Sequence, residues 1–314
     1  MVSIGNGASA VRMGIMLNND VSKSRPSDAI DALERQVAQS AADGFSSVWL
    51  SHIFGFDALT ALAVVGRNVP GIELGTAVVP TYPHHPGVLA QQALTVNAAV
   101  GGRFALGIGL SHKIVIEDMY GYSFDRPARH MREYLSVLLP LLRGEPVSFE
   151  GETLRANLEL SAPPAPDMPV LIAALAPRML KLAGAMADGT VLWMAGRKAV
   201  AEHIAPSITK AAEEAGRPAP RIVCALPVCV TDDAEAASAR ADQIFEIYGQ
   251  LPSYRAVLER EGAERPGQVA VVGDEETVAR RLDDLAAAGV TDFVASPFGS
   301  AESVARTREL LRSI

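Results

Sequence analysis

Short apolar runs alternate with longer amphipathic stretches along almost the whole chain. In the longer stretches apolar residues recur at steps of three or four, as Leu33, Val37 and Ala41 do, which indicates helices that bury one face. About eight such repeats predict a parallel sheet, and favour a closed (β/α)8 TIM barrel over an open doubly wound sheet. The expected strands are Met13–Leu17, Ser47–Leu50, Ile72–Val79, Arg103–Leu110, Val170–Ala174, Thr190–Met194, Ile222–Val230 and Thr291–Ala295.

Two insertions interrupt the alternation. The first, Ser111–Asp167, follows the fourth strand and is too long for one loop. It contains a helical pattern at Arg129–Leu142 and a hairpin pattern around Glu150-Gly151. The second insertion follows the seventh strand and contains the helical stretch Pro252–Glu261. No linker rich in Pro, Gly or Ser divides the chain, so we expect one domain over residues 12–314 behind a flexible leader, residues 1–11.

Composition narrows the class of protein. With 49% hydrophobic and 20% charged residues, the chain has the balance of an ordinary globular protein with a sizeable core. A net charge of −8 argues against nucleic-acid binding, which needs clustered Lys and Arg. No apolar run of ~18 residues predicts a membrane span, and the first residues lack the pattern of a signal peptide. A cytoplasmic enzyme is therefore expected.

Few residues suggest metal or thiol chemistry. Cys224 and Cys229 stand five apart in one expected strand, so they point to opposite faces and are interpreted as small buried hydrophobic residues. The chain has no HExxH, no Cys-x-x-Cys and no GxSxG motif, so neither a metal site nor a serine hydrolase is predicted.

In a barrel, chemistry belongs at the carboxyl ends of the strands. His52 and His112 both fall there and could transfer protons near neutral pH, although a lone histidine is more often structural. His84 and His85 precede a helix and are weaker candidates. The two remaining histidines, His130 and His203, are expected on exposed helix surfaces.

Two further strand ends have distinctive sequences. Gly107-Ile-Gly109-Leu110-Ser111-His112 begins like a dinucleotide fingerprint but lacks the third glycine; its glycines either allow a tight turn or let a flat ring approach the backbone. In Ala174-Leu175-Ala176-Pro177-Arg178, Pro177 fits the first position of a helix whose free amides could bind an anion. Arg178 and Lys181 are either partners of a bound phosphate or solvated basic residues.

Together these stretches resemble the luciferase-like monooxygenase superfamily. The resemblance runs from about Met13 to Leu311, and its most specific part is Gly-Gly-Arg-Phe-Ala-Leu-Gly-Ile-Gly at residues 101–109. Gly75-Thr76-Ala77-Val78-Val79-Pro80 and the His85-Pro86 pair are also similar to the family. The forms of the Gly107–His112 and Ala173–Arg178 segments are most similar to oxidoreductases that use the deazaflavin coenzyme F-420 (F420).

The resemblance implies hydride transfer at the deazaflavin C5 and a cofactor ring packed on a bulge at the end of the third strand. The bulge would hold a non-proline cis peptide between Ala77 and Val78. By motif position, His52 would lie beside the reacting ring, and His112 replaces an acidic group of related dehydrogenases. The implied cofactor-binding residues are Ala77, Val78, Gly109, Leu110, Ser111, Ala174, Leu175, Ala176, Pro177, Arg178, Trp193 and Met194.

Three functions follow as alternatives. The first is an F420-dependent oxidoreductase that acts on a small-molecule substrate. The others are an FMN-dependent monooxygenase that uses molecular oxygen, and a non-catalytic barrel. By analogy with the fold we expect a homodimer. The substrate is expected at the first insertion, where Tyr120, Tyr122 and Phe124 either line an apolar pocket or seal the insertion onto the barrel.

Overall fold

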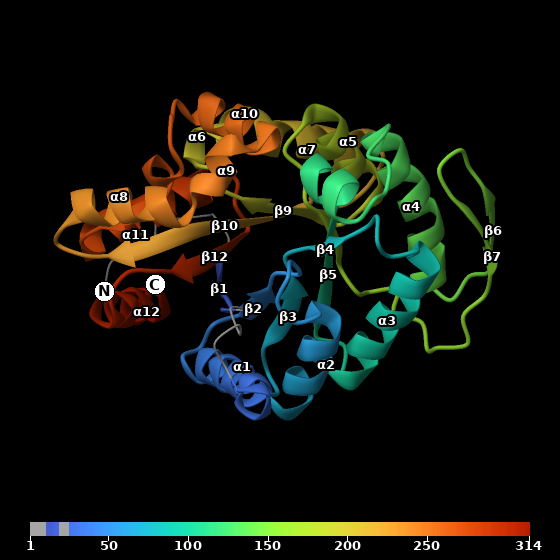
Figure 1. Ribbon diagram of the computed structural model, residues 1–314, viewed down its shortest axis with the longest axis horizontal. Coiled ribbons are helices and arrows are strands. Elements are labelled where there is room, and N and C mark those ends of the chain that lie inside the picture. The colour runs from blue at the N-terminus through green and yellow to red at the C-terminus, as the bar shows by residue number, and fades with distance from the viewer. Residues whose placement is uncertain (1–10, 19–24) are drawn as a thin grey trace.

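The computed structural model describes residues 11–18 and 25–314. Within these residues, parallel strands close into a barrel in the order β1-β2-β3-β5-β8-β9-β10-β12, and β12 pairs back onto β1 (Figure 1). The predicted (β/α)8 barrel is therefore confirmed. Except for Val11, the predicted leader lies outside the described residues. The barrel strands are β1 (Arg12–Met16), β2 (Ser47–Leu50), β3 (Glu73–Thr76), β5 (Phe104–Gly109), β8 (Val170–Ile172), β9 (Gly189–Trp193), β10 (Arg221–Val230) and β12 (Asp292–Pro297).

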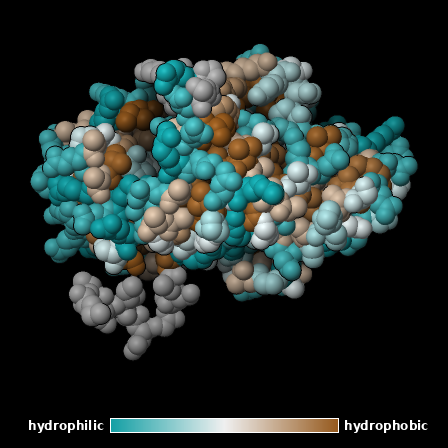
Figure 2. Space-filling model, turned by 90° about the horizontal axis from the view of Figure 1, so that it is seen from below, coloured by the Kyte–Doolittle hydropathy of each residue, from teal (hydrophilic) through white to brown (hydrophobic). Residues whose placement is uncertain are grey.

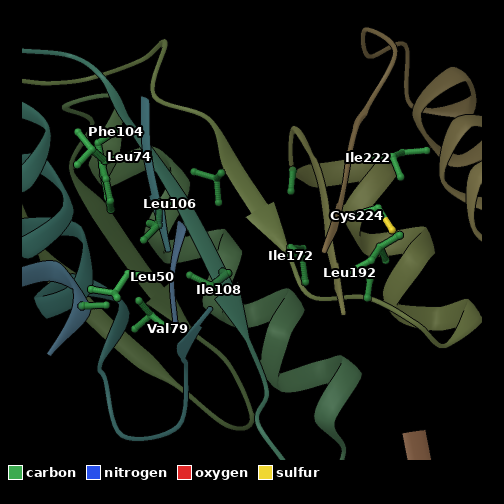
Figure 3. Close-up of a cluster of buried hydrophobic side chains, with 14 of the residues drawn as sticks. Leu50, Leu74, Val79, Phe104, Leu106, Ile108, Ile172, Leu192, Ile222 and Cys224 are labelled. Atoms are coloured by element: carbon green, nitrogen blue, oxygen red, sulfur yellow. The ribbon is translucent and has the colours of Figure 1, made fainter. Parts of the chain in front are cut away.

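Helices surround the barrel and cover the outward-facing side chains of its strands. Alternate residues of a strand point to opposite faces, so Leu106 and Ile108 of β5 face the helices whereas Ala105 faces the barrel interior. Figure 3 shows outward-facing residues of several neighbouring strands. The main outer helices are α1 (Pro26–Ala42), α2 (Ala58–Asn68), α3 (Pro86–Ala99), α4 (Pro127–Leu142), α5 (Pro177–Met186), α7 (Ala205–Glu214), α11 (Glu275–Ala287) and α12 (Ala301–Ser313).

Both predicted insertions are present. The first contains the π-helical segment η1 (Ile114–Met119), helix α4 and an antiparallel hairpin, β6 (Val147–Glu150) with β7 (Arg155–Leu158). The hairpin lies at the right-hand edge of Figure 1, outside α4. The second insertion contains α10 (Pro252–Glu261), the 3-10 turn η3 (Pro266–Gln268) and β11 (Val271–Gly273). Strand β11 extends the sheet by pairing with Val228–Val230 of β10.

Several predicted boundaries differ from the structure. The apolar pattern of residues 199–215 predicts one helix, but the helical segment begins earlier, as α6 (Arg197–Ala199), continues through the π-helical η2 (Val200–Ile204) and ends as α7. The pattern of residues 234–248 also predicts one helix, and the structure divides it at Phe245 into α8 (Ala234–Ile244) and α9 (Glu246–Gln250). No helix in residues 11–18 and 25–314 is long and apolar enough to span a membrane.

The third predicted strand, Ile72–Val79, is interrupted. Strand β3 ends at Thr76, the chain passes through a cis peptide bond between Ala77 and Val78, and pairing with β5 resumes at β4 (Val79–Pro80). The Thr76 hydroxyl donates to the carbonyl oxygen of Gly107 and accepts from its amide. A Cβ atom at residue 107 would overlap the carbonyl oxygen of Thr76, so only glycine lets β5 approach the bulge this closely.

The amino-terminal end of the barrel is closed by charged side chains. Arg221 donates to Asp292 Oδ1 at 2.6 Å and to Glu73 Oε1 at 2.9 Å, and Arg12 lies 3.2 Å from Asp292. Burial opposes the charge of Arg221, but the hydrogen bonds to the two carboxylates outweigh it and raise the pKa of this guanidinium. A network at the amino-terminal end leaves the carboxyl ends of the strands for chemistry.

Both cysteines lie in the protein interior. Cys224 and Cys229 are buried and free, as predicted, and burial raises the pKa of the Cys224 thiol to about 12.

The surface is mixed in character. On the face shown in Figure 2, hydrophobic residues occur in small groups among hydrophilic ones.

Candidate active site at the carboxyl ends of the barrel strands

An apolar floor closes the barrel interior beneath the carboxyl ends of the strands. The interior is filled by fully or almost fully buried side chains, among them Trp49, Leu171 and Val294. Four partly buried residues pack on this cluster: Met16, Ala77, Val78 and Trp193. They come from the ends of β1 and β9 and from the bulge after β3. A flat, uncharged ring could lie on this floor without burying an unpaired charge.

Gly109 and Val78 make the bulge and β5 fit together. A Cβ atom at residue 109 would lie 2.6 Å from Cγ2 of Val78 and 3.2 Å from Cβ of Ala173. The glycine therefore keeps room for Val78 between two strand ends. Beyond it, Leu110 packs partly buried against the core, and Ser111 has a φ of 60°.

Ser111 and Met194 share an unusual backbone conformation. Both have φ in the left-handed region, 60° and 57°, although neither is glycine. Such residues cost about 1–3 kcal/mol each and concentrate at functional sites. Ser111 follows β5, and the fully buried Met194 follows β9. Two predicted cofactor residues thus turn the chain sharply at the carboxyl ends of their strands.

His52 lies in a cluster with Asp57 and His84. Its Nδ1 accepts a long 3.4 Å hydrogen bond from the amide of Ala58, and its Nε2 is 3.7 Å from Oδ2 of Asp57. Burial lowers the pKa of His52; the Asp57 carboxylate opposes this shift, and His84 adds to it. The ring is therefore neutral near pH 7.

His52, Asp57 and His84 could each offer one ligand atom to a metal ion. These three atoms lie within 4.8 Å of one another, close enough to share an ion. The Ala58 amide places a lone pair on Nδ1 of His52 and the proton on Nε2, the nitrogen that faces Asp57. This tautomer suits an interaction between Nε2–H and the carboxylate better than coordination of a metal through Nε2.

His112, the other predicted catalytic histidine, has different neighbours. Its ring lies 5.6 Å from that of Tyr254 on α10, and burial lowers the pKa of His112. His52 instead faces His84, after β4. The two histidines thus stand at the carboxyl ends of β2 and β5 but contact different parts of the rim.

The start of α5 presents free amides. Ala176 occupies the N-cap position with no side-chain cap, and Pro177 follows at the first helical position. Ala176, Pro177 and Arg178 are exposed, whereas Ala174 is buried and Leu175 is half-buried. Arg178 makes no ion pair within the described part of the chain. This terminus can accept an anion without displacing a side-chain cap.

The prediction that His203 is a surface residue is wrong. Its Nε2 donates to the carbonyl oxygen of Leu175 at 2.9 Å, with the proton on Nε2, and its side chain is half-buried. His203 thereby holds the segment that leads into α5. The π-helical turn η2, which the periodicity did not reveal, directs His203 toward this segment.

The prediction that His130 is a surface residue is also wrong. Its ring stacks on Tyr82 at 4.0 Å, and its Nε2 lies 3.0 Å from the hydroxyl of Thr81. Burial lowers the pKa of His130 to about 4, against a smaller opposing effect of Glu133. Tyr134, one helical turn further along α4, is fully buried, and that spacing was the available signal.

The first insertion covers this cluster and borders an open cavity of about 590 Å³. Phe124 stacks on Tyr82 at 5.3 Å, so it seals the insertion onto the barrel. Tyr122 lines the cavity and Tyr120 is exposed. His84, Asp125 and Arg126 also line it, so this cavity has titratable and charged groups beside its apolar surface.

A second cavity, of about 840 Å³, was not anticipated from the sequence. It opens at the ends of β1, β2 and β12 and is lined by Ser51 and Ile53; the intervening His52, whose ring faces His84 and Asp57, does not line it. Its walls come from residues 53–56, residues 244–245 of the second half of the chain, and residues 296–298. Sequence periodicity could not bring these three distant segments together.

The fold and the site define a (β/α)8 enzyme with an apolar floor, an uncapped helix start and neutral histidines at the carboxyl ends of its strands. The family model described as luciferase-like monooxygenase matches residues 11–292. The chain belongs to this family, which confirms the resemblance inferred from its motifs.

Named relatives cover most of the chain. A 5,10-methylenetetrahydromethanopterin reductase of Methanolobus tindarius is 29% identical over 304 residues, 87% of this chain and 93% of the relative. An F420-dependent glucose-6-phosphate dehydrogenase of Nakamurella multipartita is 30% identical over 248 residues, 74% of this chain and 71% of the relative. The solved structure of the F420-dependent tetrahydromethanopterin reductase of Methanopyrus kandleri has a similar fold, with a TM-score of 0.79, 24% identity and coverage of 97% and 98%.

Proposed function

We propose that this protein is an F420-dependent oxidoreductase that transfers a hydride between the deazaflavin and a small organic molecule. The observation that carries the proposal is the apolar floor of Met16, Ala77, Val78 and Trp193, at the same end of the barrel as the neutral ring of His52. Two similar proteins, from Methanopyrus kandleri and Nakamurella multipartita, are named for their dependence on F420.

The residues at the barrel mouth fit such a cofactor. Ala77 and Val78 support the ring from the bulge, and Gly109 leaves the space that a side chain would fill. Leu110, Ser111 and Trp193 would border the ring and ribityl chain. The side chain of Met194 is fully buried with Leu258 and Val269, so this residue would contribute through its backbone. The phosphate is held by the Ala174–Arg178 segment, through the free amides at the start of α5 and the guanidinium of Arg178. When bound, F420 supplies two-electron hydride chemistry at C5 of its ring.

His52 is the proposed proton-transfer residue. Because its lowered pKa keeps the ring neutral near pH 7, its Nδ1 lone pair, which is held only by the long 3.4 Å hydrogen bond from the Ala58 amide, can accept a proton from a substrate hydroxyl that loses a hydride. Asp57, whose carboxylate lies 3.7 Å from Nε2, stabilises the imidazolium that results. In the reductive direction the same imidazolium returns the proton. His112, also neutral because of burial, is the proposed second proton-handling residue.

Parallel titrations of the purified protein with oxidised F420 and with FMN test this proposal. We expect F420 to bind and FMN to bind much more weakly; tight FMN binding with no F420 binding would refute the proposal. The catalytic assignment is tested by His52→Ala and His112→Ala, which should lower turnover more than cofactor affinity. Unchanged turnover in both variants would remove the assignment.

An FMN-dependent monooxygenase is the second candidate, because the matching family model is described as luciferase-like monooxygenase. It requires oxygen uptake coupled to reduced FMN, so turnover at full rate without oxygen excludes it. A non-catalytic barrel would consume no reduced F420 with any acceptor.

Three organisational features belong to the same proposal: one domain over residues 12–314, a homodimer, and a cytoplasmic location. Light scattering coupled to size exclusion tests the dimer, which predicts twice the 33.1 kDa chain mass. A single cooperative unfolding transition, seen with two spectroscopic probes, tests the single domain. Cell fractionation tests the location.

A further inference from the structure

The 840 Å³ cavity at the ends of β1, β2 and β12 has predominantly apolar walls. Ile53 and Phe54 follow β2, Ile244 and Phe245 join α8 to α9, and Phe298 follows β12. The polar groups that line it are those of Asn18, Ser51 and Ser296, which lie at the ends of β1, β2 and β12. The cavity is therefore apolar along its walls, with polar groups where the strands end.

The described residues that line this cavity carry no charge: they include no Asp, Glu, Lys, Arg or His. The cavity under the first insertion differs, because His84, Asp125 and Arg126 line it. An ionised group that entered the apolar cavity would lose its hydration without gaining a partner of opposite charge, which is costly. The apolar cavity therefore selects against phosphates and carboxylates.

Several large apolar side chains are exposed around this cavity. Phe54 is 66% exposed, Ile53 56% and Ile244 43%. Apolar side chains that are exposed singly are common, but a group of them around one concave site marks a ligand-binding surface. A ligand that covers these three side chains removes their apolar surface from water.

The cavity shares one residue with the proposed cofactor site. Met16 lines the cavity and also belongs to the apolar floor of the barrel. Ser51 and Ser296 place hydroxyl groups at the strand ends that border the cavity. A molecule seated in the cavity with one end at these strand ends therefore reaches the edge of the floor on which the cofactor ring is proposed to lie.

We propose that the substrate is an uncharged, largely apolar molecule with one carbonyl or hydroxyl group. Its apolar part lies on Ile53, Phe54 and Ile244, and its oxygen points to the hydroxyl groups of Ser51 and Ser296 at the strand ends. The proposal rests on the proposed F420 chemistry, and it distinguishes this chain from its relative named for glucose 6-phosphate. The phosphate of that sugar would find no cation among the described residues of this cavity.

Displacement of the neutral apolar dye Nile red by a series of straight-chain 2-alkanones tests the proposal in the full-length protein. Each added methylene should tighten binding by about fourfold, since burying a CH2 contributes about 0.8 kcal/mol, until the cavity is filled. Phe54→Ser and Ile244→Asp should weaken both dye and alkanone binding at least about tenfold. Val64→Ser, which changes a 48% exposed side chain on α2, is the matched control and should leave binding unchanged.

Three results would overturn the proposal: alkanone affinity independent of chain length, equal effects of the cavity variants and Val64→Ser, or displacement of the dye by glucose 6-phosphate but not by alkanones. The F420 titration, run on the same preparation, keeps the two proposals separate. Normal F420 binding without a chain-length dependence refutes only the substrate class. A clear chain-length dependence without F420 binding supports the cavity assignment and refutes the cofactor.

Discussion

The ring of His84 meets the ring of His52 edge to face, with centroids 5.4 Å apart and an interplanar angle of 89°. Nδ1 of His84 donates to the carbonyl oxygen of Pro80 at 2.8 Å, so the short strand β4 fixes the orientation of His84. The backbone that supports the proposed cofactor ring therefore also positions the neighbour of the proposed proton-transfer residue. His84 is a positioning residue in this arrangement.

The pKa of His52 should move in opposite directions when its two neighbours are changed. Asp57→Asn removes the carboxylate that raises this pKa, so the pKa should fall further; asparagine can still cap α2. His84→Asn removes a group that lowers it, so the pKa should rise. NMR titration of histidine-labelled protein measures both shifts. The same direction of change in both variants would contradict this electrostatic account of the cluster.

The fold could be predicted because each strand or helix pattern that defines it lies within a short segment of the sequence. Alternation of strand and helix patterns identified every barrel strand, and apolar residues at alternate positions face the helices as expected. The bulge at Ala77 and Val78 could not be predicted from periodicity. Residues 72–79 form one uninterrupted apolar run, so periodicity predicted one strand, and only the family resemblance pointed to Ala77 and Val78. A backbone interruption of this kind leaves no periodic trace.

Contacts between distant segments escaped sequence reasoning. His130 was assigned to a helix surface, because its partner Tyr82 lies 48 positions away and becomes adjacent only when the insertion folds back. The apolar cavity was missed for the same reason, since residues 53–54, 244–245 and 296–298 share no pattern. The substrate was expected at the first insertion, which does border a cavity, and that expectation stays a prediction; the substrate site proposed above lies at the ends of β1, β2 and β12.

Gly109→Ala should weaken F420 binding about tenfold, because the new Cβ atom would lie 2.6 Å from Cγ2 of Val78 and displace the bulge. Val78→Ala removes that methyl group. The double variant should therefore regain part of the lost affinity, leaving only the 3.2 Å contact with Ala173. Fluorescence titration with F420 measures all three variants. If the two single effects simply add, Val78 is not the residue that Gly109 accommodates.

Arg178→Ala should weaken F420 binding by about tenfold, as expected when a charge-assisted contact to a phosphate is lost. The variant should also respond less to salt than the original protein, because salt screens the removed attraction. Titrations at low and high salt measure both effects. Lys210→Ala, on the exposed surface of α7, is the matched control and should leave both the affinity and its salt dependence unchanged.

Arg221→Met should destabilise the fold by about 3 kcal/mol, because it removes the main partner of the almost fully buried Asp292. Urea unfolding gives the change in the free energy of unfolding. Arg306→Met provides the comparison: Arg306 also pairs with two carboxylates, Asp232 and Glu275, but at the surface. Its loss should cost less, since exposed ion pairs contribute little. Equal losses would mean that the network at the base of the barrel is not effectively buried.

His130 should make stability depend on pH in the acid range. Burial lowers the pKa of His130 to about 4 in the folded protein, against about 6.5 for an exposed histidine, so the unfolded chain binds more protons between these values. The stabilising contribution is complete above about pH 6.5 and is lost as pH falls toward about 4. Between about pH 7 and pH 5 the loss should reach about 1–2 kcal/mol, allowing for partial exposure of the ring. In His130→Gln, which cannot titrate, urea unfolding at the two pH values should show a correspondingly smaller loss. An identical loss in the variant would mean that the stacked ring of His130 is already accessible to protons in the folded protein.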